Sequence, residues 1–312
     1  MDHHGHGMDM ADLPPFSFSR LFEIGGDGFF LAGCLLLAAL YGWGVWRLAR
    51  RGDRWPVGRA VSFFLGVASI FAVTCTGLND YGMVLFTAHM AQHMVISMVS
   101  PVLLLLGAPV TLLLRALPAG GRARRLAVRL LHSRYARLVT SVFFTIPLFV
   151  ASLYGLYFTP LFDFLMESRA GHIAMMVHFL AVGLVFFFPI MGVDPGPHRP
   201  GYLMRMLELF ATMPFHAFFG IALMMASEPM VDTFADPPAS LAVEALSDQS
   251  SAGGMAWAFS EIPTVVVLIA LVVQWYVSEE RRARRLDRTA DRDGDQDLAA
   301  YNAYLASLQA RG

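Results

Sequence analysis

Long apolar runs alternate with short polar stretches along the chain, and this pattern predicts a bundle of membrane-spanning helices. Seven runs are long enough to cross the roughly 30 Å hydrocarbon core of a bilayer at about 1.5 Å per residue. They lie at about 28–48, 60–78, 82–106, 137–158, 171–190, 205–226 and 258–277. Because unpaired backbone groups are costly in hydrocarbon, each run should be a helix. The pattern therefore predicts an all-α integral membrane protein with seven transmembrane helices.

Composition agrees with this pattern and sets the domain organisation. The chain has 312 residues, of which 56% are hydrophobic, and its mean hydropathy is +0.54. The first residues have neither a basic start nor a small-residue cleavage site, so we expect the first run to remain as an anchor. We predict a His/Met-rich extracytoplasmic tail over 1–26, a transmembrane domain over 27–278 and a charged cytoplasmic tail over 279–312.

Arginine placement predicts the orientation of the bundle. The chain has no lysine, and 21 of its 23 basic residues follow the first, third, fifth and seventh runs. Arg20 and Arg169 are the two on the other side. The positive-inside rule then puts the N-terminus outside, in the periplasm, and the C-terminus in the cytoplasm. A retinal-based pump is excluded, since its Schiff base needs a lysine. We expect the lipid bilayer as a partner, and no nucleic acid.

Polar side chains in the third run interrupt its lipid-like character. The motif HMAQHM at 89–94 places His89 and His93 four residues apart, on one face of a helix. Met90 and Met94 form a parallel stripe with the same spacing. Histidine within a span is costly and usually faces the bundle interior. The motif therefore predicts an inward-facing polar site.

Two further runs bring histidine and methionine to the same outer half of the bilayer. GHIAMMVH in the fifth run supplies His172 and His178, which lie about 120° apart around a helix, so we expect one of them to share the site's direction. MPFHAFFG in the sixth run supplies Met213 and His216. Imidazole suits Zn, Cu and Fe, and thioether adds a preference for Cu(I). This distribution predicts a metal site, most simply for copper, although interhelical hydrogen bonds with methionine as filler would give the same pattern.

The N-terminal tail adds a second candidate copper site. Met1, Asp2 and His3 can surround Cu(II) with an amine, two amides and an imidazole. Further potential ligands follow at His4, His6, Met8 and Met10. A short His-rich tract of this kind is typical of metal binding.

Acidic and amide side chains at the same depth are candidate second-layer groups. Asp80, in GLNDYG, is expected to cap the second run at its outer end. Asp248 and Gln249, in a predicted loop before the last run, can cap or coordinate. Glu261 could hydrogen-bond a ligand histidine or relay a proton, and Gln92 lies between the two histidines of HMAQHM.

The motifs together resemble a known family. HMAQHM, SPVLLLLGAP, MPFHAFFG and DQSSAGGMAW, within about 25–278, are similar to the polytopic CtaG family of assembly factors for caa-type cytochrome c oxidases. The resemblance implies a bacterial inner (plasma) membrane protein that matures the oxidase by supplying copper to its catalytic subunit. A periplasmic copper chaperone is a further candidate partner. The resemblance carries over His89, Gln92, His93 and Met94 from the first motif, and Asp248, Gln249, Gly253 and Trp257 from the last.

Two other functions fit a cluster of membrane histidines. A seven-helix zinc hydrolase needs several histidines, an acid such as Asp80 or Glu261, and an open metal position for water. A haem-binding cytochrome needs histidines on facing helices as axial ligands. The Met neighbours and the absence of a Ser/Asp set among the histidines argue against the zinc hydrolase. The leading hypothesis is a copper-handling, non-enzymatic assembly factor, with zinc and haem as the less favoured cofactors.

Overall fold

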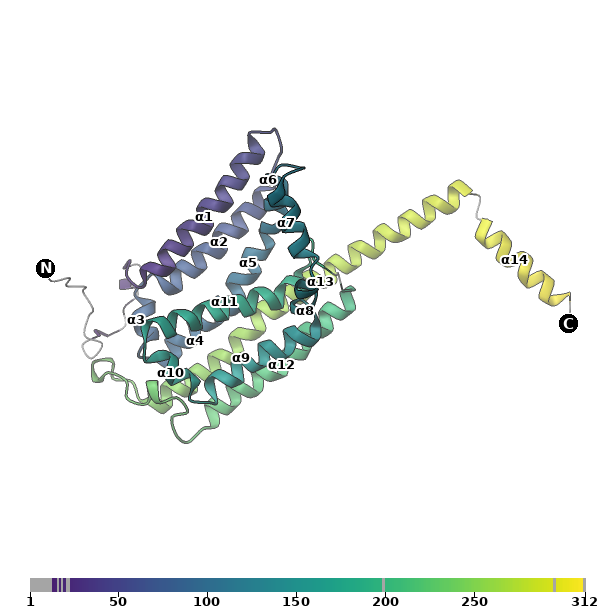
Figure 1. Ribbon diagram of the computed structural model, residues 1–312. Coiled ribbons are helices and arrows are strands. Elements are labelled where there is room, and N and C mark those ends of the chain that lie inside the picture. The colour runs from purple at the N-terminus through teal and green to yellow at the C-terminus, as the bar shows by residue number, and fades with distance from the viewer. Residues whose placement is uncertain are drawn as a thin grey trace. The chain divides into compact units, whose positions relative to one another are not determined.

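A computed structural model describes residues 13–310 except 16, 18, 21–22, 198–199 and 294–295. The described chain is almost entirely helical, with an isolated bridge between Ile24 and Thr76. It divides into two compact units, Met1–Val266 and Val267–Gly312. The first contains the helical bundle seen in Figure 1. The second contains the later part of α13 and helix α14.

Six helical segments among the described residues are long and apolar enough to cross a membrane. They are α1 (Gly28–Ala49), α2 (Val57–Thr74), the composite segment Phe86–Ala116, α11 (Arg169–Met191), α12 (Tyr202–Met225) and part of α13 (Ala245–Asp293). The fourth predicted run folds as α9 (Val142–Tyr157), an apolar helix of 16 residues that is shorter than the others. The chain is thus a multi-pass helical membrane protein, and all seven predicted runs contain a helix.

The segment Phe86–Ala116 is not one regular helix, contrary to the prediction of a single helix over 82–106. It comprises α4 (Phe86–Met94), a π-helical turn η3 (Val95–Val99), α5 (Ser100–Leu106) and α6 (Pro109–Ala116). Pro101 has no N–H for the carbonyl of Ser97, so regular α-helical bonding cannot continue through this turn. The widened turn follows directly after the HMAQHM motif.

This composite segment and α11 form the centre of the bundle. In the apolar stretch of the composite segment 56% of the residues are buried, and in that of α11 50% are buried. The corresponding share in α1 is 22%. The composite segment packs on α2 through α5, and α11 packs on η3, α5, α9 and α12. Gly183 of α11 lies directly against the Ser97 carbonyl, where a larger side chain would collide. The HMAQHM motif therefore lies in the most enclosed part of the bundle.

Helix α13 begins earlier than the sequence predicts. Residues 245–257, expected as a loop, form the first turns of α13. Gly253 of α13 meets Gly220 of α12 so closely that a Cβ on either would lie 2.6 Å from the other's carbonyl oxygen. Small residues at such a crossing let two membrane helices approach closely.

The connections carry short helices. They are α3 (Leu78–Gly82), α7 (Arg122–Leu131), α8 (Arg134–Val139), α10 (Leu161–Met166) and the 3₁₀ turns η4 (Asp232–Phe234) and η5 (Ala239–Leu241). Helix α14 (Gln296–Gln309) follows α13. Helix α2 ends at Thr74, and Asp80 lies in the separate helix α3, so Asp80 does not cap α2 as predicted.

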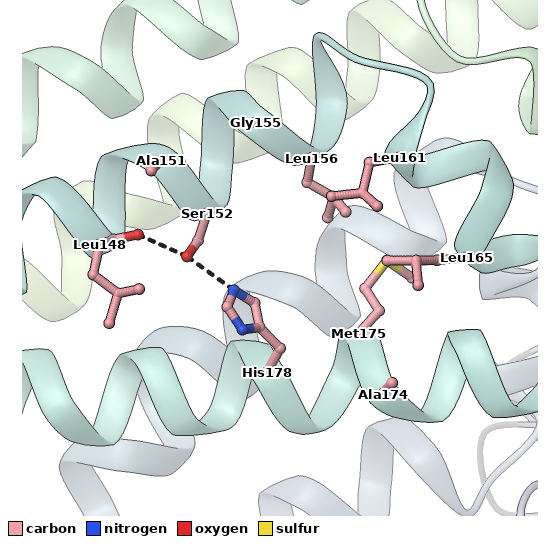
Figure 2. A pocket seen from close by; sticks show the side chains of 10 residues that line it. All are labelled: Leu148, Ala151, Ser152, Gly155, Leu156, Leu161, Leu165, Ala174, Met175 and His178. Atoms are coloured by element: carbon pink, nitrogen blue, oxygen red, sulfur yellow. Dashed lines mark hydrogen bonds between the residues drawn. The ribbon is translucent and has the colours of Figure 1, made fainter.

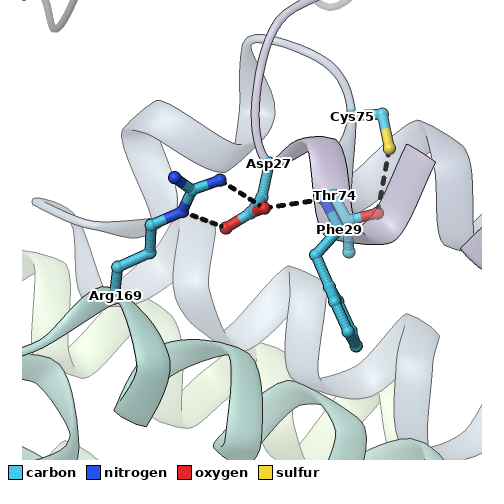
Figure 3. A network of polar contacts seen from close by, with 5 residues as sticks. All are labelled: Asp27, Phe29, Thr74, Cys75 and Arg169. Carbon is cyan, nitrogen blue, oxygen red and sulfur yellow. Dashed lines mark hydrogen bonds and ion pairs between the residues drawn. The ribbon is translucent and has the colours of Figure 1, made fainter. Parts of the chain in front are cut away.

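The start of α1 is tied to α11 by an ion pair (Figure 3). Asp27 caps α1 by accepting from the Phe29 amide at 2.9 Å, and it also pairs with Arg169 at 2.7 Å. The Arg169 guanidinium holds the pKa of the Asp27 carboxyl below its usual value. This contact joins the two helices at the end opposite most of the arginines.

Candidate functional site

Two histidines of HMAQHM share one hydroxyl group. His89 Nε2 lies 3.1 Å from the Tyr157 oxygen, and His93 Nδ1 lies 2.9 Å from the same oxygen. All three side chains are buried. Since a phenol can donate one hydrogen bond and accept another, Tyr157 can serve both rings at once. The last residue of α9 thus holds two imidazoles of α4 in place.

Aromatic rings enclose this His–Tyr–His triad, as we call His89, Tyr157 and His93. The His89 ring packs edge-on against the Phe162 ring, with 4.9 Å between the ring centroids. The centroids of the His93 and Phe179 rings lie 3.9 Å apart. Tyr157 itself stacks on Phe162 at 5.1 Å. These contacts exclude water and fix the ring planes, so the imidazole nitrogens are directed by packing as well as by hydrogen bonds.

The start of α4 is fixed by a residue from α13. Leu85 provides no side-chain cap, and the Asp248 carboxylate instead accepts from the amides of Phe86 at 2.5 Å and Thr87 at 3.1 Å. The Thr87 hydroxyl donates to the Asp248 carbonyl at 3.0 Å. An anion at a helix N-terminus satisfies free amides and favours the helix dipole. Asp248 therefore sets where the helix bearing the triad begins.

A small cavity extends the polar region from His93 toward α12. Its volume is about 10 Å³, and His93, Ser97, Ser152 and His216 provide its polar lining. The Ser97 hydroxyl donates to the His93 carbonyl at 2.7 Å, within the π turn. A cavity of this size has room for about one water molecule. His216 is therefore connected to His93 across a gap rather than by a direct hydrogen bond.

His178 points toward Ser152 in a groove between α9 and α11 (Figure 2). Its Nε2 lies 2.9 Å from the Ser152 hydroxyl, which donates to the Leu148 carbonyl at 2.7 Å. The groove has a volume of about 460 Å³ and is otherwise apolar, with Leu156 and Met175 in its wall. Of the two histidines of α11, His172 is the buried one, and its Nε2 has no hydrogen-bond partner in the structure.

Comparison with known proteins decides what kind of protein carries this arrangement. Residues 39–278 match the model of the family described as cytochrome c oxidase caa3 assembly factor (Caa3_CtaG). The chain belongs to this assembly-factor family. The match spans the triad, His172, His178 and His216, whereas the predicted tail ligands Met1, Asp2, His3, His4, His6, Met8 and Met10 precede it and lie outside the described residues.

Proteins similar to this chain occur in mycobacteria. Two proteins named as uncharacterized, from Mycobacterium bovis and Mycobacterium tuberculosis, are each 44% identical over 291 residues, which is 90% of this chain. A third, from Mycobacterium leprae, is 42% identical over 95% of the chain. The chain spans less than half of the length of these relatives, 44–46%. No solved structure matches it.

The structure gives the surroundings of four of the amide and acidic residues predicted beside the metal. Gln92 donates to the Val73 carbonyl at 2.6 Å, and Gln249 accepts from the Met230 amide at 2.8 Å. Glu261 accepts from the Trp257 indole at 3.0 Å. Asp80 is half-buried in α3, and burial raises the pKa of its carboxyl. The hydrogen bonds described for these residues hold helices and loops rather than histidines.

The methionines predicted as metal ligands differ in how far their side chains are buried. Met90 and Met94 are fully enclosed on α4, whereas Met213 of α12 is partly exposed. Within the described part of the chain, no group of three or more His, Cys, Asp and Glu side chains is placed to hold a metal ion. The arrangement offers pairs of imidazoles, which differs from the three-ligand set that a zinc hydrolase needs.

Two buried polar residues, Tyr157 and Glu208, were not among the site residues predicted from the sequence. Tyr157 could not be recognised, because its role depends on how α9 lies against α4. Glu208 is buried in α12 and accepts from the Thr145 hydroxyl at 2.6 Å, while its second oxygen has no hydrogen-bond partner in the structure. A carboxyl within an apolar run is a signal that the sequence did contain.

Proposed function

We propose that this assembly factor binds copper within its membrane domain and delivers it to the catalytic subunit of a caa3-type cytochrome c oxidase. Copper is the cargo in this scheme, and a periplasmic copper chaperone is a fitting donor. The proposal places the chain in the bacterial inner membrane with seven spans and its N-terminus in the periplasm. Family membership supports the role in oxidase assembly, and the chemistry of the triad supports copper.

One observation carries the copper proposal. The two triad nitrogens each lie about 3 Å from the Tyr157 oxygen, so they are at most about 6 Å apart. A metal ion bound to both would need them about 4 Å apart, since a metal–imidazole bond is about 2 Å long. A modest side-chain movement that withdraws the hydroxyl would let an ion take its place. In the protein without copper, the Tyr157 hydroxyl would then occupy the position between the two imidazoles that the ion takes.

The kind of donor favours a cuprous ion. Cu(I) accepts few ligands and is suited to imidazole and thioether groups. Two imidazoles joined by a displaceable hydroxyl bind less firmly than a closed set of four ligands, which suits release to a client. His216, across the cavity from His93, offers a second binding position for the same ion.

The distribution of arginine supports the proposed orientation. Arg51, Arg115 and Arg124, from three separate segments, line one pocket at one end of the bundle. Arg169 lies at the opposite end of the first and fifth predicted spans, paired with Asp27. Segregation of this kind is what the positive-inside rule describes for cytoplasmic loops.

A copper titration of the purified full chain tests the site. Cu(I) would be added in competition with a colorimetric chelator to the unaltered protein and to the His89→Ala/His93→Ala variant. We expect the variant to lose one copper equivalent or at least about tenfold in affinity. Tyr157→Phe should bind copper at least as tightly as the unaltered protein, because the competing hydroxyl is gone.

The matched control is His132→Ala, which removes an exposed imidazole at the end of α7. Replacing His3, His4 and His6 by Ala tests the tail separately. Equal stoichiometry and affinity in the double variant and the unaltered protein would exclude the intramembrane site. Delivery is measured as the copper content and activity of the oxidase in cells that make each variant at equal levels.

A further inference from the structure

A pocket at the arginine-rich end of the bundle has the features of an anion site. It has a volume of about 280 Å³ and lies where three connections meet: those between α1 and α2, between α6 and α7, and after α11. Its lining includes Arg51, Asp53, Thr111, Arg115, Arg124 and Pro195. The pocket is remote in sequence from the triad.

The charge around this pocket is positive. Arg51, Arg115 and Arg124 outnumber Asp53, which pairs with Arg115 at 3.3 Å. The other carboxylate beside it, that of Asp194, accepts from the amides of Val110 at 3.0 Å and Thr111 at 2.7 Å at the start of α6. Even with Asp194 counted, three guanidinium groups face two carboxylates, so the charge around the pocket stays net positive.

Contacts between the connections give the pocket its shape. The Arg51 guanidinium donates to the Arg115 carbonyl at 3.4 Å, linking the α1–α2 connection to α6. Arg115 also lies over the Trp55 ring at 5.5 Å. Asp194 fixes the segment after α11 onto α6. The arginines are thus held near one another before any ligand arrives, which lowers the entropic cost of binding.

The surroundings place this pocket at the level of lipid headgroups. Helix α7, which supplies Arg124, has no buried residue and exposes Leu126 and Leu130 as well as its arginines. Such an amphipathic helix lies in the interface of a membrane. Arg47 and Arg50 lie over Trp43 and Trp46, each at 5.0 Å, near the end of α1. Tryptophan and arginine in this position mark the boundary between hydrocarbon and water.

We propose that this pocket binds the phosphate monoanion of an anionic phospholipid headgroup. Guanidinium groups match phosphate oxygens in charge and geometry, and a basic pocket between transmembrane helices suits an anionic headgroup. Another groove on α6, formed with α1 and α11, is apolar and has a volume of about 370 Å³. A neighbouring surface that accepts acyl chains favours an amphiphile over free phosphate. This inference is independent of copper binding.

The test compares two double variants that remove the same charge. Arg51→Gln/Arg124→Gln removes two arginines of the pocket, and Arg50→Gln/Arg125→Gln removes their sequence neighbours, which do not line it. All four side chains are exposed, so both variants should fold. The full chain in neutral detergent would be titrated with phosphatidylglycerol, and retained lipid would be counted by native mass spectrometry.

We expect the pocket variant to bind phosphatidylglycerol at least tenfold more weakly than the unaltered protein, since one basic residue near an anionic lipid contributes roughly fivefold. The control variant should stay within about threefold of the unaltered protein. Phosphatidylcholine and inorganic phosphate, tested at the same concentrations, should bind far more weakly than phosphatidylglycerol. Equal losses in the two variants would show diffuse surface charge and overturn the proposal. Inorganic phosphate binding as tightly as the lipid would overturn the lipid assignment.

Discussion

At the scale of single residues, one hydroxyl compensates for the burial of two imidazoles. A buried polar group without a partner costs about 1–3 kcal/mol, so two unpaired histidines in hydrocarbon would be a serious penalty. Tyr157 removes part of that penalty because it contacts one nitrogen of each ring, while His89 Nδ1 has no hydrogen-bond partner in the structure. The same hydroxyl keeps the nitrogens near each other, which is the condition for their joint use in binding an ion.

The Tyr157→Phe variant should lower the free energy of unfolding by about 1–3 kcal/mol, because it leaves two buried ring nitrogens without their shared partner. Thermal unfolding of the purified chain in detergent measures this change. Tyr154→Phe is the matched control, since it removes an equivalent oxygen from the same helix, a half-buried one that donates to the Phe215 carbonyl at 2.8 Å. A larger loss from the control would contradict the importance assigned to the triad.

The Asp27–Arg169 pair should make stability depend on pH in acid. The pKa of Asp27 is lowered in the folded chain, so its contribution is complete above the ordinary aspartate value of 3.8 and disappears as pH falls through the lowered folded value. Because Arg169 is exposed, solvent screens the pair and its contribution to stability should be small. Unfolding curves from pH 7 to pH 3 should converge for the unaltered chain and Asp27→Asn. A constant difference at all pH values would refute the linkage.

At the scale of helices, aspartates from distant segments begin elements that lack caps of their own. Asp248 caps α4, Asp194 caps α6, and Asp163 accepts from the Thr233 amide at 2.8 Å in η4. In each case the carboxylate satisfies free amides at a helix start. The start of each of these helices is therefore fixed by a residue distant in sequence. For α4 that residue is Asp248 of α13, so this contact fixes where the helix bearing His89 and His93 begins.

The crossing of α12 and α13 tests packing at this scale. Gly253→Ala should destabilise the protein by about 1–3 kcal/mol, because the new Cβ would lie 2.6 Å from the Gly220 carbonyl oxygen and force the helices apart. Gly254→Ala, one residue later, meets only the Met224 sulfur at 3.8 Å and should leave stability within about 0.5 kcal/mol. Melting midpoints of the two variants should therefore differ. Equal midpoints would show that the close approach is unimportant.

At the scale of the whole molecule, basic charge and the histidine site separate toward opposite ends of the spans. The pocket of Arg51, Arg115 and Arg124 lies at one end of the bundle, and the Asp27–Arg169 pair lies at the other. In the proposed orientation, cytoplasmic arginines hold the bundle in place while the triad lies toward the periplasmic side. Copper could then arrive from the periplasm without crossing the full bilayer.

Thiol labelling checks this orientation directly. The native cysteines Cys34 and Cys75 are both buried, so their background reaction should be low. In intact cells, a membrane-impermeant maleimide should label Asp236→Cys, in the connection between α12 and α13, but label Arg54→Cys only after permeabilisation. The reverse result would place the N-terminus in the cytoplasm and remove the proposed route for copper.

The sequence by itself determined the helical class, the approximate position of each apolar run and the family. These features depend on local quantities, namely hydropathy over about 20 residues, the 3.6-residue period and short motifs. His89 and His93 could be assigned to one helical face because four residues separate them. Arginine counts predicted an orientation for the same reason, since they require only the order of the runs.

Only the tertiary structure decided which partners those side chains meet. Tyr157 lies 64 residues from His93 along the chain and Asp248 lies 162 residues from Phe86, so neither contact leaves a local signal. His178 points into the groove between α9 and α11 while His172 is buried, a choice made by the rotation of α11 against α9. Helix rotation and crossing follow from packing over the whole bundle, as at Gly183 and Gly253, and no window of sequence contains that information.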